Sequence, residues 1–306
     1  MVTNPASLIT KAASKQTYYT VRFLVDRHRV DDAYRAYGYF RWVDDILDAD
    51  SGSASKRKAF VERQKSLLES CYRGEFPREV NLQENMLVEL VQHDQEKNSG
   101  LQSYLRNMMR VMDFDAGRRG RLISQVELDE YTRWLSIAVA EAMHYFIGHA
   151  DFAPQEETRY LAVSAAHIIH MLRDTYDDVQ AGYFNIPREV LDANAIGPGD
   201  VRSHAYRAWV ESRVRLAREY FSAGKAYYRR VQNRRHRLAA QAYIARFEWL
   251  VQTIEREGFI LRPQYGERKS MGTGLRMSWL TLSSMVNLRR VSPLSQPVAV
   301  PPLGKS

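Results

Sequence analysis

Apolar residues recur every three to four positions along most of this chain, which is the spacing of an α-helix with one buried face. No stretch shows the sustained alternation of apolar and polar residues that a half-buried strand requires. Breakers such as Asn98-Ser-Gly and Ile196-Gly-Pro-Gly separate the periodic segments. The pattern predicts an all-α fold with helices over residues 14–25, 30–49, 56–72, 83–97, 101–114, 125–149, 156–180, 200–231, 235–257 and 273–287.

Length and composition predict one helical body followed by a tail. The chain has 306 residues and no evident internal repeat, so residues 1–290 are expected to form a single domain. Residues 291–306 contain four prolines and almost no charge, and we expect them to be disordered.

Two segments place acidic residues along one face of a helix. At ~100° per residue, the first segment aligns four side chains within about 40° of one line: Tyr37, Arg41, Asp44 and Asp48. Steps of three and four residues align a second set: His167, His170, Asp174 and Asp178, with Arg173 beside them. We call these sets the first and second carboxylate stripes.

The two stripes indicate a metal site. An arbitrary Asp-rich helix is usually a solvated surface, but apolar and aromatic residues surround the first stripe, which indicates a helix buried on most sides. Facing carboxylates repel one another unless a cation lies between them. Carboxylate oxygens suit Mg²⁺, which proteins often share with the phosphates of a substrate. The expected ligands are Asp44, Asp48, Asp174 and Asp178.

The net charge of the chain limits the classes of partner that it is expected to bind. A net charge of +8 and a pI of about 9.5 are compatible with nucleic acid, an anionic membrane surface or a phosphorylated substrate. No zinc ligands, helix-turn-helix pattern or RNP-like strand supports nucleic acid. The basic segments 229–237 and 262–276 instead favour peripheral contact with anionic lipid.

The number of cysteines and the hydropathy of the chain indicate the cellular compartment of the protein. The single Cys71 excludes an internal disulfide, which fits a reducing environment. There is no pattern of a secretory signal, and no apolar run reaches the ~18 residues that span a bilayer. We therefore expect a cytoplasmic protein that touches the membrane surface from outside the bilayer.

Both stripes together resemble the motifs of the squalene/phytoene synthase family, the head-to-head branch of the trans-isoprenyl diphosphate synthases. The run from Tyr37 to Asp48 is similar to the family's first motif without a gap, and Leu172 to Asp178 resembles the second motif. Weaker similarities lie at the pair Ser14-Lys15 and at the segments ending in Asp115, Tyr131 and Gly258, the last including Tyr243.

The resemblance implies an all-α isoprenoid-synthase bundle around a central cavity that binds two prenyl diphosphates with Mg²⁺. It implies the reaction as well: one diphosphate leaves, the cation is captured as a cyclopropyl diphosphate, and a second ionisation leads to squalene or phytoene. Use of NADPH stays open. The implied catalytic residues are Tyr37, Arg41, Tyr131, Arg173 and Tyr243. The implied substrate-binding residues are Ser14, Lys15, Arg41, Arg173 and His167, and the implied metal ligands are Asp44, Asp48, His170, Asp174 and Asp178.

The chain departs from the family at three places. His167 and His170 replace the usual Gln and Asn, residues 181–187 lack two expected arginines, and residues 135–140 are bulkier than the family's small-residue stretch. The histidines are interpreted as core side chains, as ligands that prefer Mn²⁺, Fe²⁺ or Zn²⁺, or as groups that transfer a proton.

Two further functions compete with head-to-head condensation. A site that has lost two arginines would suit a terpene cyclase or a prenyl-diphosphate lyase, which ionises one substrate. A non-catalytic subunit that binds prenyl lipid is the third alternative. The intact carboxylates argue against it, because an idle protein gains nothing from their repulsion.

Overall fold

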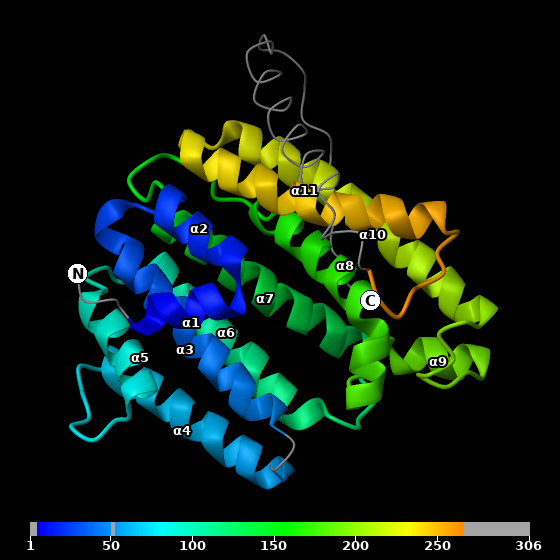
Figure 1. The fold of residues 1–306 in the computed structure, drawn as a ribbon, viewed down its shortest axis with the longest axis horizontal. Helices are drawn as coiled ribbons and strands as arrows, with labels where there is room; N and C mark the ends of the chain where they lie inside the picture. The colour runs from blue at the N-terminus through cyan, green and yellow to red at the C-terminus, as the bar shows by residue number, and fades with distance from the viewer. Residues whose placement is uncertain (1–4, 50–52, 266–306) are drawn as a thin grey trace.

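The computed structural model describes residues 5–49 and 53–265, which form eleven α-helices and one 3₁₀ turn (Figure 1). The described residues contain no strand, so the prediction of an all-α fold is confirmed. In chain order the elements are α1 (Pro5–Ala13), α2 (Lys15–Leu24), η1 (Arg27–Arg29), α3 (Val30–Asp48), α4 (Ala54–Tyr72), α5 (Leu82–His93), α6 (Gly100–Arg118), α7 (Gln125–Phe146), α8 (Thr158–Ala181), α9 (Arg188–Asn194), α10 (His204–Arg230) and α11 (Arg234–Arg256).

Nine of the ten predicted helices are present. The tenth, over residues 273–287, and the predicted tail at 291–306 lie outside the described residues. Helices α1 and α9 were not predicted. Helix α1 begins at Pro5 and α9 follows Pro187, and proline is favourable at the start of a helix. Neither helix is long enough to show a clear periodicity of apolar residues.

The helices divide into two groups, each with its own hydrophobic cluster. Helices α1 to α7 enclose the first cluster, which includes Tyr39, Leu87 and Leu105. Helices α8, α10 and α11 enclose the second, which includes Ile169 and Phe221. Figure 1 shows α7 at the edge of the first group, next to α8 of the second. The first stripe, on α3, and the second, on α8, therefore belong to different groups.

A glycine sets how closely α10 approaches α8. A Cβ added at Gly224 would lie 2.6 Å from the Cβ of Ala162 and 2.9 Å from its backbone nitrogen. Only a residue without a side chain fits this contact. The contact presses α10 against the N-terminal half of α8, which fixes the helix that carries the second stripe.

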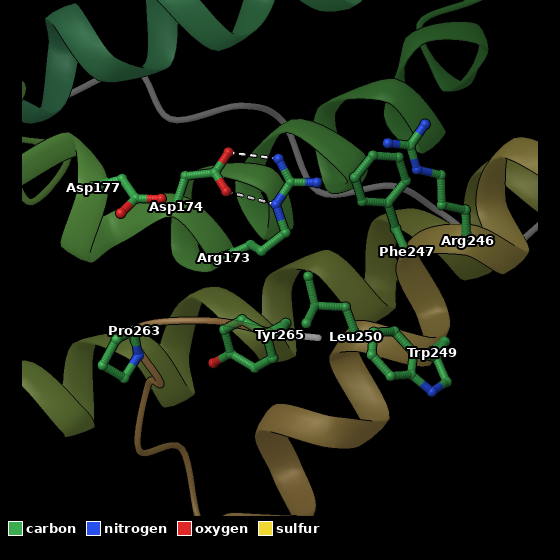
Figure 2. A pocket seen from close by; sticks show the side chains of 9 residues that line it. All are labelled: Arg173, Asp174, Asp177, Arg246, Phe247, Trp249, Leu250, Pro263 and Tyr265. Carbon is green, nitrogen blue, oxygen red and sulfur yellow. Dashed lines mark hydrogen bonds and ion pairs between the residues drawn. The ribbon is translucent and has the colours of Figure 1, made fainter. Parts of the chain in front are cut away.

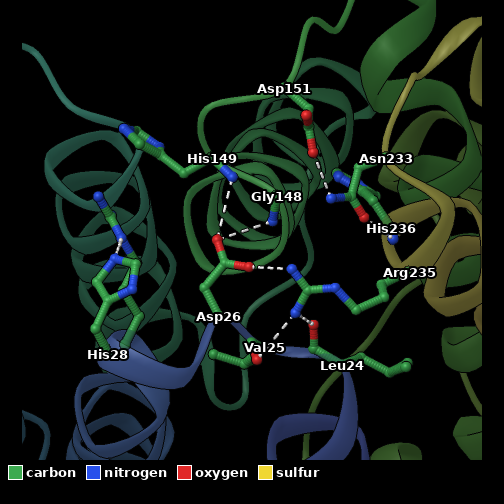
Figure 3. Close-up of polar contacts among 11 residues, drawn as sticks. Leu24, Val25, Asp26, His28, Gly148, His149, Asp151, Asn233, Arg235 and His236 are labelled. Atoms are coloured by element: carbon green, nitrogen blue, oxygen red, sulfur yellow. Dashed lines mark hydrogen bonds and ion pairs between the residues drawn. The ribbon is translucent and has the colours of Figure 1, made fainter.

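Asp26 joins three connecting segments of the bundle (Figure 3). Its Oδ2 accepts hydrogen bonds from the backbone N–H of Gly148 at 3.0 Å and of His149 at 3.3 Å. Its Oδ1 pairs with Arg235, which also donates to the backbone carbonyls of residues 24 and 25. The linker after α2, the loop after α7 and the start of α11 are thereby held together.

The basic segment 229–237 is largely used in contacts within the protein. Arg230 pairs with Glu156, Arg235 pairs with Asp26, and Arg237 donates to two backbone carbonyls at the end of α10. This reduces the charge available for a lipid surface, and contact with a membrane stays a prediction. None of the helices over the described residues combines the length and the low polarity needed to cross a membrane.

We expect Asp26→Asn to lower the free energy of unfolding by about 1–3 kcal/mol at pH 7, because the charge-assisted bond to Arg235 is lost. Burial alone would raise the pKa of Asp26, but the bonds from Arg235, Gly148 and His149 hold it below its usual value. The stabilisation is therefore present above about pH 4 and fades as the pH falls through the lowered pKa.

Urea denaturation of both proteins at pH 7 and at pH 3 measures this difference. Glu75→Gln is the control, because Glu75 pairs with Arg73 at an exposed position, where solvent screens an ion pair and it contributes little to stability. Equal stability of Asp26→Asn and the native protein at pH 7 would contradict the prediction.

Candidate active site

The first stripe lies on α3, with its charged groups near the C-terminal end of the helix. Arg41 donates through Nη1 to Asp44 Oδ2 at 3.3 Å and pairs through Nη2 with Asp45. Burial, together with the charge of Asp48, raises the pKa of Asp44 to about 6. Partial burial also raises the pKa of Asp48. These two carboxylates lack enough positive charge around them, which is the condition in which a cation binds.

The second stripe lies on α8 and is organised by Arg173. Its Nε and Nη2 donate to the two carboxylate oxygens of Asp174, each at 2.6 Å. Nη2 also lies 2.7 Å from Nε2 of His170, and that nitrogen is 3.5 Å from Asp174. The two predicted metal ligands at 170 and 174 therefore both contact a cation of the protein.

Asp178 differs from Asp174 because no arginine among the described residues pairs with it directly. Burial, followed by the charge of Asp174, raises its pKa to about 7. Its Oδ2 accepts one hydrogen bond, from Nδ2 of Asn185 at 2.7 Å. Asp178 thus retains a site at which a cation would relieve unbalanced negative charge.

A chain of hydrogen bonds leads from Asp178 into the interior. Asn185 accepts at 2.8 Å from Arg118 Nη1, and Arg118 Nε donates to Asp115 at 2.6 Å. The hydroxyl of Tyr131 donates to the other oxygen of Asp115 at 3.0 Å. We call these five residues the buried network.

Asp115 is the point at which the two stripes meet. Its charge contributes to the raised pKa of both Asp44 and Asp178, and burial together with Asp48 raises its own pKa in spite of Arg118. Residues of α3, α6 and α8 therefore share one electrostatic field. The sequence predicts the stripes on separate helices, and in the structure the charge of Asp115 acts on both of them.

Arg118 and Asn185 were not predicted as site residues. Arg118 lies in the segment Gly117-Arg-Arg-Gly, which reads as a helix break, yet α6 continues to Arg118 and places its guanidinium in the interior with 7% of the residue exposed. Asn185 is brought in by the loop after α8. That loop is held by a bond from the N–H of Gly120 to the carbonyl of Gly182 at 2.7 Å.

His167 and Tyr131 form a buried pair beside the network. Their ring centroids are 5.1 Å apart, and Nε2 of His167 is buried without a hydrogen-bond partner in the described structure. Burial, with the charges of His170 and Arg118, holds the pKa of His167 well below its usual range. The imidazole is therefore neutral, with a ring nitrogen to which no described residue is hydrogen-bonded.

The remaining predicted residues lie at the end of the bundle formed by α2, α3 and α11. Ser14 caps α2 and its side chain is hydrogen-bonded to Tyr37. Lys15 is exposed in the first turn of α2. Tyr243, on α11, stacks edgewise on Phe247 with 5.3 Å between ring centroids, and burial raises its pKa to about 12.

The described residues contain no group of three His, Cys, Asp or Glu side chains close enough to hold one metal ion. The donors present are nevertheless carboxylate oxygens with raised pKa values at 44, 48 and 178. Such donors fit a hard ion that takes its other ligands from substrate phosphates and water, as Mg²⁺ commonly does. The ligand set, including His170, stays a prediction.

A pocket of about 530 Å³ opens between α8, α11 and the segment 261–265 (Figure 2). Its lining residues are Arg173, Asp174, Asp177, Arg246, Phe247, Trp249, Leu250, Pro263 and Tyr265. None of them belongs to α3. The pocket therefore lies on the side of the second stripe and combines two arginines with an aromatic wall.

The family model for squalene/phytoene synthase matches residues 10–271, which is most of the chain and includes both stripes and the buried network. The chain belongs to the squalene/phytoene synthase family. Members of this family are prenyltransferases that act on prenyl diphosphates. A comparison with curated protein sequences finds no match.

Two solved structures share the fold of this chain. Squalene synthase HpnC from Alicyclobacillus acidocaldarius is 17% identical, with a TM-score of 0.65 over 84% of this chain and 94% of that chain. A dehydrosqualene synthase in complex with a ligand is 14% identical, with a TM-score of 0.66 over 93% of this chain and 95% of that chain. At these identities the likeness shows the shared isoprenoid-synthase fold.

The raised pKa of Asp178 predicts a pH-dependent stability. Between about pH 4 and pH 7 the folded protein keeps a proton on Asp178 that the unfolded chain has released. The stability of the metal-free protein therefore falls as the pH rises through this range. We expect Asp178→Asn to be more stable than the native protein by about 1–3 kcal/mol at pH 8, and to show a clearly smaller gain at pH 5.

Chemical denaturation in EDTA at the two pH values measures this effect. Asp192→Asn is the control, because Asp192 is an exposed carboxylate of α9 and belongs to neither stripe. Added Mg²⁺ should stabilise the native protein more at pH 8 than at pH 5, and Asp178→Asn should lose this response. A variant less stable than the native protein at pH 8 would contradict the prediction.

The two histidines give a separate prediction. If they bind metal, replacing His167 with Gln and His170 with Asn shifts the metal preference from Mn²⁺ toward Mg²⁺, because amide oxygens suit the harder ion. If His167 takes up a proton, the replacement leaves metal preference unchanged and alters the products. Activity with each metal, followed by product analysis, separates the two, and no change in either would assign both side chains to packing.

Proposed function

We propose that this enzyme condenses two prenyl diphosphates head to head into a squalene- or phytoene-like hydrocarbon. The observation that carries the proposal is the buried network, which links Asp115 of α6 to Asp178 of α8 through one cation, Arg118. The charge of Asp115 also raises the pKa of Asp44, so the carboxylates of α3 share the same electrostatic field. Two acidic motifs in one field can serve two successive losses of diphosphate, as this reaction requires. The family assignment supports the same reaction class.

Departure of diphosphate needs positive charge near the leaving oxygens. A divalent ion, Mg²⁺ or Mn²⁺, bound by Asp44, Asp48 and Asp178 would neutralise that developing charge. Arg41 and Arg173 lie on the two stripes, and each now pairs with a carboxylate that it can share with an incoming anion. Lys15 and Ser14, at the start of α2, are the remaining predicted contacts for diphosphate.

The allylic cation that remains after diphosphate leaves needs an apolar, aromatic environment without positive charge. Tyr131 is buried, and its ring lies 5.1 Å from Phe114. An aromatic face can stabilise a desolvated cation by about 2 kcal/mol. The neutral state of His167 avoids adding a positive charge beside that cation. Because the hydroxyl of Tyr131 is fixed on Asp115, the ring keeps its orientation.

One observation favours a second candidate, ionisation of a single substrate. The buried Nε2 of His167 has no hydrogen-bond partner in the described structure, so it is available as a base that removes a proton from the cation. Proton loss from a cation derived from one substrate would give the product of a cyclase or a lyase. The missing arginines in residues 181–187 agree with this alternative.

Product analysis decides between these functions. The protein is incubated with farnesyl or geranylgeranyl diphosphate, with Mg²⁺ or Mn²⁺ and with or without NADPH, and hydrocarbons are identified by mass spectrometry. The proposal expects a product with twice the carbon number of the substrate. Products with the carbon number of one substrate would assign the single-substrate reaction, and binding without any turnover would assign a non-catalytic subunit.

We expect Asp44→Ala, Asp48→Ala, Asp174→Ala and Asp178→Ala each to lower kcat by at least ~100-fold, because each removes charge at the step where diphosphate leaves. Circular dichroism checks that each variant stays folded, and Asp192→Ala in α9 should retain full activity. Near-normal turnover in any two of the four variants would refute a site built from both stripes.

A further inference from the structure

Arg246, on α11, is a cation without an ionic partner in the part of the chain that the structure describes. Its Nη1 donates to Oε1 of Gln16 at 3.0 Å, and its Nε is buried without a hydrogen-bond partner. No ion pair to Arg246 occurs among the residues that the structure describes. A partly buried guanidinium usually pairs with a carboxylate or binds an anion, because removing its charge from water is costly.

A second guanidinium shares the pocket with Arg246. Figure 2 shows Arg173 and Arg246 on the same side of the pocket, with the ring of Phe247 drawn between them. Burial, followed by the charge of Arg173, lowers the pKa of Arg246, so each cation disfavours the other. Asp174 neutralises Arg173 but makes no hydrogen bond to Arg246. An anion with several oxygens would satisfy both arginines.

The rest of the pocket is apolar. Phe247, Trp249, Leu250 and Tyr265 form its wall, and the pocket volume of about 530 Å³ lies in the range of small-molecule sites. The other acidic lining residue, Asp177, is exposed at the end of α8 that carries the second stripe. A ligand that suits this surface carries an anionic head of several oxygens and a hydrocarbon chain.

We propose that Arg246 is a substrate-binding residue that, with Arg173, holds the diphosphate of one prenyl diphosphate, while the aromatic wall contacts the chain of the same molecule. This inference rests on the proposed function for the identity of the ligand. Residues 181–187 of this chain contain no arginine. With Arg246 from α11, two cations are still present to bind a diphosphate.

Binding of inorganic pyrophosphate tests the role of Arg246 without any need for turnover. Titration calorimetry in Mg²⁺ should show affinity weaker by about 10- to 100-fold in Arg246→Gln, the loss expected for a charge-assisted hydrogen bond, and a smaller loss in Arg246→Lys. Arg256→Gln is the matched control, because Arg256 is an exposed arginine in the last turn of the same helix. Its affinity should equal that of the native protein.

Two further variants separate binding from structure. Gln16→Leu removes the contact between α2 and Arg246 without removing the charge, and it should change pyrophosphate affinity less than twofold. Trp249→Leu should leave pyrophosphate affinity unchanged while raising KM for farnesyl diphosphate several-fold. Circular dichroism confirms that each variant is folded.

Native pyrophosphate affinity in Arg246→Gln would overturn the proposal, and so would a loss in Gln16→Leu as large as that in Arg246→Gln. If Arg246→Gln weakens pyrophosphate binding but the native enzyme yields no hydrocarbon of doubled carbon number, the proposed function fails and the anion site stands. If condensation occurs and Arg246→Gln keeps the native KM, the proposed function stands and this inference fails.

Discussion

Crowded negative charge is the constraint around which this site is built. Carboxylates on α3, α6 and α8 raise one another's pKa, and the buried arginine Arg118 lies between those of α6 and α8 in the part of the chain that the structure describes. Ion pairs removed from water repay their desolvation only when the geometry is good and the remaining donors are satisfied. This requirement accounts for Asn185 and Tyr131, which complete the hydrogen bonds of Arg118 and Asp115. A site that still lacks positive charge after these contacts is prepared for a cation and a phosphate ligand.

The fold and both stripes could be predicted because they depend on local periodicity. The three-to-four spacing of apolar residues identified nine helices, and the same spacing aligned the carboxylates. Arg118 could not be identified in this way, since a Gly on each side of an arginine pair signals a helix break and only tertiary packing extends α6 through it. Asn185 carries no local signal, because its role depends on where a loop is anchored.

The departures from the family pattern concern where the positively charged side chains of the site are located. The loop after α8 contributes an amide, Asn185, at a stretch where the family commonly has arginines, and Arg118 and Arg246 provide cations from α6 and α11. Charge that stands on helices is held more rigidly than charge on a loop, because each helix is fixed by packing along its length. The histidines fit this pattern as well, since His170 contacts Arg173 whereas His167 stays neutral in the interior.

The division of the bundle into two hydrophobic clusters has a mechanical consequence. The first and second stripes stand on opposite sides of the boundary between the two groups of helices. Apolar contacts cross this boundary, because Met171 of α8 packs with Ile123 and Leu128, and Met143 of α7 contacts both clusters. Moving one group against the other would therefore expose apolar surface and also break the hydrogen bonds that run from Arg118 through Asn185 to Asp178. The separation of the two stripes is thus set by the packing of the bundle before any ligand binds.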